Sequence, residues 1–229
     1  MITKRPLKSE ERDFFTLVRR AAFANPFSDE RSEIDLQISG SDTWASQEER
    51  IKAVVSEISR QIGILEQEGI ADINMYSGDD RNMIEKVFLF ELFYQFKDKF
   101  DQLILDQIQN DDAPVKIPFL NEALNALMQR GFSEELARRY FALGFQMRRA
   151  YFFIKQSLAG NSASMKSLRL NLWNNIFTHD IDFYTRYLWD KMEDFSTLLL
   201  GETGKIHART VKSDRHFAPR IVGMPPCRT

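Results

Sequence analysis

The strongest constraint on the fold is an apolar repeat at helical spacing. It is clearest over residues 51–65, where six apolar residues return every three or four positions: Ile51, Val54, Val55, Ile58, Ile62 and Leu65. Such a stripe predicts an amphipathic helix with one buried face, and Gly69 stands where a C-cap glycine belongs. The same spacing at residues 14–22 predicts an earlier helix, for which Ser9 is the expected N-cap.

Three more helices are expected further along the chain. Residues 78–109 carry apolar side chains on more than one face, which indicates one long helix at the centre of a bundle. Shorter helices are predicted over residues 121–129 and 133–158, and the small-residue stretch Ala159–Ser164 then marks a domain boundary.

The polar residues 28–42 are expected to form a loop with a short extended piece at Ile34–Ile38. No alternation of strands and helices occurs before residue 195. The chain is therefore predicted to be mainly α, with residues 1–160 forming a helical bundle of antiparallel neighbours.

Composition excludes several functional classes. The net charge is −2 at pH 7, so no overall field favours nucleic acid or a membrane surface. Cys227 is the single cysteine, which rules out an internal disulfide and a cysteine-rich zinc site. No secretory leader and no membrane-spanning run is found. We therefore expect a cytoplasmic protein with no membrane partner.

A second region is predicted over residues 161–204. Apolar spacing there indicates two helices with a break near Thr178–Asp180, followed by a short buried strand ending at Leu200. The next five residues resemble part of a phosphate-binding loop: Gly201, Glu202, Thr203, Gly204 and Lys205. In such a loop, backbone N–H groups and a helix N-terminus hold phosphate oxygens, and the lysine adds a positive charge.

This loop is shorter than the usual pattern G-x-x-x-x-G-K-[ST]. Lys205 comes two residues too early, and Ile206 stands where a serine or threonine would help to bind Mg²⁺. The five residues are therefore candidate nucleotide-binding positions of a degenerate loop, and no cofactor is expected to bind this chain. No catalytic residue or metal ligand is predicted, because His179–Asp180 lacks further ligands and suits a turn or helix cap.

The segment LWNNIFTHDIDFYTRYLWDKMEDFSTLLLGETG, residues 172–204, resembles the start of the AAA+ ATPase module of bacterial sigma-54-dependent transcription activators. In that family, a tryptophan and an IFTHD-like segment precede a helix, and a TLLLGETGTGKE-like strand and loop follow. The matching positions are Trp173, Ile176–Asp180, Tyr184, Leu188, Met192, Asp194 and Thr197–Gly204.

The resemblance implies that residues 1–160 are a regulatory, signal-sensing region on which a protein partner or small effector acts. It implies that the full-length protein hydrolyses ATP with Mg²⁺ and contacts sigma-54 RNA polymerase. This chain alone is expected to lack ATPase activity, because the later motifs of the module and the DNA-reading helix-turn-helix are not found in it.

From Lys205 onward the chain departs from the family, which continues with Thr-Gly-Lys after Gly204. Residues 205–229 hold three prolines and a single acidic residue, Asp214, without regular apolar spacing. We expect them to form an irregular, disordered tail. The abrupt change suggests the hypothesis of a frameshift near codon 205, which reading the coding DNA in all three frames would test.

A second class of function stays open, in which the chain is a stand-alone α-helical protein-interaction domain and a homo-oligomer is one form it could take. Arginines stand beside aromatic residues in the helix expected after residue 133: Arg138, Arg139, Arg148 and Arg149. With a net charge near zero, this pattern favours a solvated face or a partner contact over a nucleic-acid surface.

Overall fold

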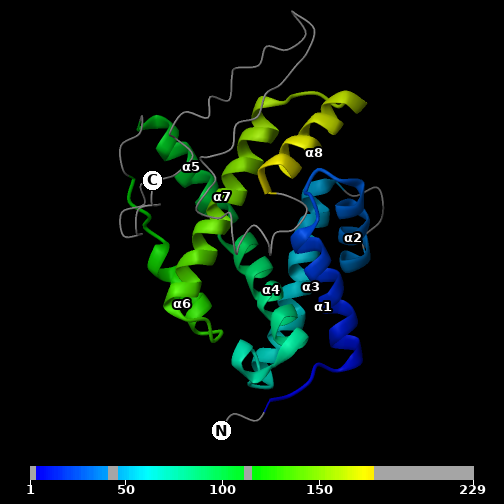
Figure 1. The fold of residues 1–229 in the computed structure, drawn as a ribbon, viewed down its shortest axis with the longest axis vertical. Coiled ribbons are helices and arrows are strands. Elements are labelled where there is room, and N and C mark those ends of the chain that lie inside the picture. The colour runs from blue at the N-terminus through cyan, green and yellow to red at the C-terminus, as the bar shows by residue number, and fades with distance from the viewer. Residues whose placement is uncertain (1–3, 41–45, 111–114, 178–229) are drawn as a thin grey trace, which may run out of the picture. The chain divides into compact units, whose positions relative to one another are not determined.

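The computed structural model describes residues 4–40, 46–110 and 115–177, and all regular structure within these ranges is helical (Figure 1). The elements are α1 (Ser9–Phe23), α2 (Asp29–Ser39), α3 (Gln47–Gln67), the 3₁₀-helix η1 (Ile73–Met75), α4 (Gly78–Gln95), α5 (Lys97–Gln109), α6 (Leu120–Met128), α7 (Glu134–Ser157) and α8 (Ala163–Phe177). The prediction of a mainly α chain is confirmed for these residues. The expected strand before Gly201 lies outside them.

The segment at Ile34–Ile38 is helical, so the prediction of an extended piece there is wrong. Local interactions explain the helix α2. The Ser28 hydroxyl accepts a hydrogen bond from the Arg31 N–H at the N-terminus, and Gly40 ends the helix at a φ of 58°. These two caps satisfy helix-end groups and outweigh the alternating apolar pattern of the sequence.

The predicted long helix over residues 78–109 is divided in two. α4 ends at Gln95 and α5 begins at Lys97, with Phe96 between them at φ −98° and ψ 2°. The Phe96 ring is buried and stacks on the Phe119 ring at 5.8 Å between centroids. Aromatic packing of this kind contributes beyond the area it buries, so it stabilises the break.

The chain divides into two compact units, which are described separately. Unit 1 comprises residues 1–98 and 119–141, and unit 2 comprises residues 99–118 and 142–229. The division falls inside α7 and inside the region predicted as one domain. The predicted boundary after residue 160 lies in the connection between α7 and α8, and as a domain boundary it stays a prediction.

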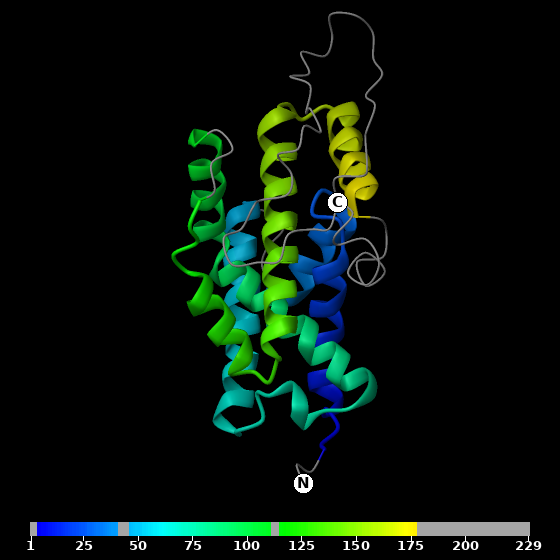
Figure 2. The same cartoon turned by 60° about the vertical axis from the view of Figure 1, so that its left-hand side comes forward.

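α4 is the central helix of unit 1. It packs against α1, α3, α6 and η1, while α2 packs against α1 and α3 (Figure 2). Its apolar residues are almost fully buried: Met83, Ile84, Val87, Phe88 and Phe90. The helix therefore needs partners on several sides, as its sequence predicts.

Unit 2 contains most of α5, the end of α7, and α8. The Arg148 guanidinium makes two hydrogen bonds of 2.6 Å to the Asp101 carboxylate, and the Phe145 and Phe100 rings lie 6.0 Å apart. Arg169 of α8 donates to the carbonyl oxygens of Leu158 and Gly160 at the end of α7. This cation therefore supplies donors to carbonyl groups of the connection between α7 and α8.

Candidate functional site

The predicted nucleotide-binding residues Gly201, Glu202, Thr203, Gly204 and Lys205 lie outside the described residues. Of the segment that resembles the ATPase module, the structure describes residues 172–177, which end α8. Trp173 and Phe177 are buried there, with ring centroids 4.5 Å apart. The first of the two helices predicted from apolar spacing over residues 161–204 is therefore present, and the helix that the resemblance implies after Asp180 lies outside the described residues.

The described residues that combine charge with burial gather around α4 in unit 1. Lys86, Phe90 and Tyr94 follow one another at four-residue intervals, so they lie along one side of this helix. The Phe90 and Tyr94 rings are 4.8 Å apart, and Lys86 is only 7% exposed. Lys86 is unusual, because lysine is rarely buried unless it is paired.

Arg31 of α2 is held at the Tyr94 end of this stripe. Its guanidinium donates to the Asp35 carboxylate at 2.8 Å, to the Ala21 carbonyl at 2.9 Å and to the Tyr94 hydroxyl at 2.8 Å. It also lies 5.3 Å from the centroid of the Phe90 ring. One buried cation thus joins α1, α2 and α4.

The charge of this cluster is costly to bury. The side chains of Arg31 and Asp35 are only 9% and 8% exposed. Burial raises the pKa of Asp35 above its ordinary value, although the nearby Arg31 acts in the opposite direction. For the pKa of Asp35, desolvation therefore outweighs the attraction of Arg31. The clearest effect of the Arg31–Asp35 pair is the geometry that it imposes on the helices around it.

Lys86 stands at the other end of the stripe, facing α1 and α7. Its ammonium group is 3.4 Å from both the Glu85 carboxylate and the Tyr140 hydroxyl, and 5.8 Å from the centroid of the Phe23 ring. The Tyr140 hydroxyl donates to Glu85. Burial raises the pKa of Tyr140 to about 12, so this tyrosine stays a neutral donor near pH 7.

A third cation, Arg130, follows α6 and reaches α3 and α4. It pairs with Glu91 at 2.8 Å and with Glu66 at 3.0 Å, and it lies 4.6 Å from the Phe88 ring centroid. The turn beside it is tied to η1, because the Ile73 N–H donates to the Arg130 carbonyl and the Asn74 amide to the Gly131 carbonyl.

These contacts position helices. In the part of the chain that the structure describes, no three His, Cys, Asp or Glu residues gather as a metal site would need. The cations Arg31, Lys86 and Arg130 each pair with a carboxylate from within unit 1. Together they connect α4 to α1, α2, α3, α7 and the turn after α6, which is an arrangement suited to holding one helix orientation.

The sequence did not single out these three cations. A charged residue in an apolar helix was the available indication for Lys86, and the four-residue spacing of Arg31 and Asp35 was the indication for that pair. The arginines of α7 were named instead, and the prediction of a solvated face is wrong for Arg148, whose side chain is 14% exposed and bonded to Asp101.

Comparison with family models, curated proteins and solved structures gives no match. Among the helices that the structure describes, none has both the length and the apolar character needed to cross a membrane.

Proposed function

We propose that this chain is the N-terminal regulatory region of a sigma-54-dependent transcription regulator, whose helical part senses a ligand or partner. One observation carries the proposal: the segment from Trp173 to Gly204 resembles the start of the family's ATPase module, and helices precede this segment. In the full-length protein, ATP and Mg²⁺ would serve the module, and the helical part would restrain or license it in the cytoplasm.

The contacts around α4 support a sensing role. An effector changes a conformational equilibrium only by binding two states with different affinity. Polar contacts between helices, such as Arg31 of α2 with the Tyr94 hydroxyl of α4 and Tyr140 of α7 with Glu85 of α4, are satisfied in one arrangement of the helices, and shifting a helix would break them. The helical part therefore has a defined resting arrangement from which an effector could shift it.

A fusion protein tests the proposed function. Residues 1–204 would be joined in frame to the Thr-Gly-Lys and following module of a family member that lacks its own regulatory region. We expect the ATPase rate of the fusion to differ from that of the isolated module by at least about fivefold, the lower end of ordinary allosteric coupling. ATP hydrolysis and transcription from a sigma-54 promoter would be measured side by side.

The control for this fusion carries Arg31→Met, which removes a buried contact without touching residues 172–204. Under the proposal, this substitution returns the ATPase rate toward that of the isolated module. Equal rates for the intact fusion, its variant and the isolated module would contradict a regulatory role.

Nucleotide binding by the present chain is a separate question. We expect millimolar Mg²⁺-ATP to leave its unfolding temperature unchanged, because a bound ligand would raise it and the loop at Gly201–Lys205 is two residues short. Thermal unfolding followed by circular dichroism checks this, with Lys205→Ala as the matched variant. Stabilisation by ATP that Lys205→Ala abolishes would show that the loop binds nucleotide.

A stand-alone interaction domain is the second candidate. It is favoured by Leu105 and Ile108 of α5, which are 40% and 51% exposed and lie three residues apart on one side of the helix. Self-association in sedimentation velocity that Leu105→Glu abolishes, together with a fusion of unchanged ATPase rate, would favour this candidate over the first.

A further inference from the structure

We infer that residues 4–8 form a strap that opens and closes over the connection between α3 and α4 while the helices stay folded. This strap precedes α1 directly and contains Lys4, Arg5, Pro6, Leu7 and Lys8. The inference concerns a movable part of unit 1 and does not rest on the proposed function.

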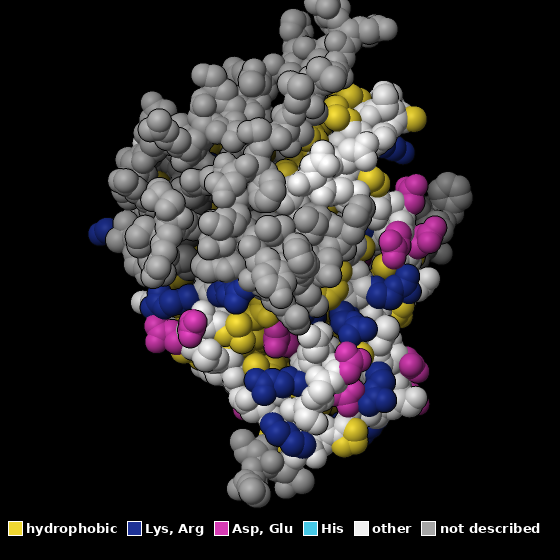
Figure 3. All heavy atoms as spheres, in the orientation of Figure 1, with side chains coloured by type: hydrophobic (Ala, Val, Ile, Leu, Met, Phe, Trp, Pro, Cys, Tyr) yellow, Lys and Arg dark blue, Asp and Glu magenta, His cyan; other side chains and the backbone are white. Residues whose placement is uncertain are grey.

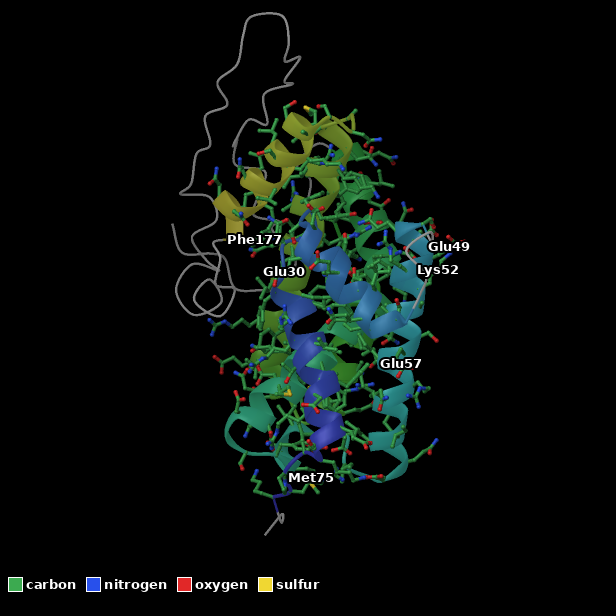
Figure 4. The ribbon with its side chains drawn as sticks, turned by 90° about the vertical axis from the view of Figure 1, so that its right-hand side faces the viewer. Glu30, Glu49, Lys52, Glu57, Met75 and Phe177 are labelled. Carbon is green, nitrogen blue, oxygen red and sulfur yellow. The ribbon has the colours of Figure 1, made fainter. Side chains whose placement is uncertain are left out.

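Few backbone bonds hold the strap. The Arg5 N–H donates to the Met75 carbonyl of η1 at 2.9 Å, and the Leu7 N–H donates to the Asp80 carboxylate at 3.0 Å. Pro6 between them has no N–H to donate. Met75 lies at the end of the bundle where the N-terminal segment passes (Figure 4).

Ion pairs supply most of the remaining contacts, and the Arg5 and Glu11 side chains, 24% and 13% exposed, form the least exposed of them. Arg5 pairs with Glu68 at 3.0 Å and with Glu11 at 2.7 Å, and Lys8 pairs with Glu68 at 3.4 Å. The Lys8 and Glu68 side chains are 63% and 39% exposed. On the face shown in Figure 3, basic and acidic side chains are interspersed over the described residues. Salt screens exposed pairs such as Lys8–Glu68 strongly.

The strap is packed more weakly than the connection between α3 and α4 that it covers. Leu7 alone among its five residues is buried, whereas Ile73 and Tyr76 of the connection are fully buried. Tyr76 also donates its hydroxyl to the Ile70 carbonyl, which holds it without help from the strap. A segment with one apolar anchor and exposed charges belongs to the least stable parts of a fold, and it opens before the core does.

Amide hydrogen exchange, measured residue by residue by NMR on the full chain, tests this inference. At low salt we expect the Arg5 and Leu7 amides to be protected, and Arg5→Gln to lower their protection by about tenfold, because two ion pairs are lost. Raising NaCl from 0.05 M to 0.5 M should lower the wild-type protection similarly. The protection of Val87 and Phe88 in α4 should not change in either experiment.

Arg60→Gln is the matched control, because Arg60 forms its ion pair with Glu57 within α3, and Glu57 is labelled in Figure 4. It should leave the strap amides as protected as in the wild type. The inference is overturned if the Arg5 and Leu7 amides exchange at the same rate as those of Val87 and Phe88. It is also overturned if neither salt nor Arg5→Gln changes their protection.

Discussion

Replacing Arg31 with methionine is expected to lower the free energy of unfolding by about 3–5 kcal/mol at pH 7, because it leaves a buried carboxylate without its cation. Asp35 loses its partner at 2.8 Å, and the Ala21 carbonyl and the Tyr94 hydroxyl each lose a donor. Urea denaturation followed by circular dichroism measures the change. Arg60→Met, at an ion pair with a 59% exposed arginine, should leave the stability nearly unchanged.

The pH dependence of the same variant distinguishes charge from packing. Burial already raises the pKa of Asp35, and removal of Arg31 takes away the main opposing influence. In the variant, the folded-state pKa of Asp35 therefore lies still further above its unfolded value. The loss of stability in the variant then grows as pH rises from the pKa of Asp35 in the unfolded state to its pKa in the folded state. The loss shrinks in acid, where Asp35 is protonated in both states.

We expect the stability lost by Arg31→Met to be smaller at pH 4.5 than at pH 7.5. A loss that is the same at both values would mean that packing, and not the unpaired Asp35, causes it. The double variant Arg31→Met/Asp35→Leu should recover most of the stability, because apolar replacement of a whole buried pair is often neutral.

Gly131→Ala is expected to lower the free energy of unfolding by about 3 kcal/mol. Gly131 has a φ of 87°, which strains any L side chain, and an added Cβ would come within 2.0 Å of the Asp72 carboxylate and 2.5 Å of the Asn74 amide. Asp72 cannot retreat freely, because its carboxylate accepts the Asn74 N–H at 2.7 Å. Urea denaturation checks the size of the loss.

The matched control for this substitution is Gly63→Ala. Gly63 lies inside α3, where an added Cβ would meet nothing within 4 Å. Alanine there should stabilise the protein by about 0.5–1 kcal/mol, because it has the higher helix propensity. If both substitutions had the same effect, the contact of the turn after α6 with η1 would not contribute to stability.

Local patterns in the sequence predicted most helices and failed at two places with identifiable causes. α3 was predicted from its stripe, and in the structure Ser46 and Glu49 form a capping box at its N-terminus. α2 was missed because Ile34, Leu36 and Ile38 alternate as in a strand, although Ser28 and Gly40 cap a helix. The break at Phe96 was missed because it is stabilised by Phe119, which is distant in sequence.

The candidate site was less predictable than the fold. The sequence placed a degenerate nucleotide loop at Gly201–Lys205, and that prediction stays untested because it lies outside the described residues. Among the described residues, nothing local in the sequence pairs Lys86 with Tyr140, or Arg130 with both Glu66 and Glu91. Such partners come from different helices, and the way in which these helices pack cannot be predicted from any one segment of the sequence.

The sequence by itself determined the helical class and the position of most helices, whereas the resemblance of residues 172–204 to the start of an ATPase module stays a prediction. Only the tertiary structure decided which charges are buried, which partners they have on other helices and which segment is held mainly by ion pairs. The physical reason is one of range. Apolar periodicity and caps act within about one or two turns of a helix. Burial depends on how separate helices pack, even for a pair within one helix such as Arg31–Asp35, and the desolvation that makes the pair consequential appears only after the helices have packed.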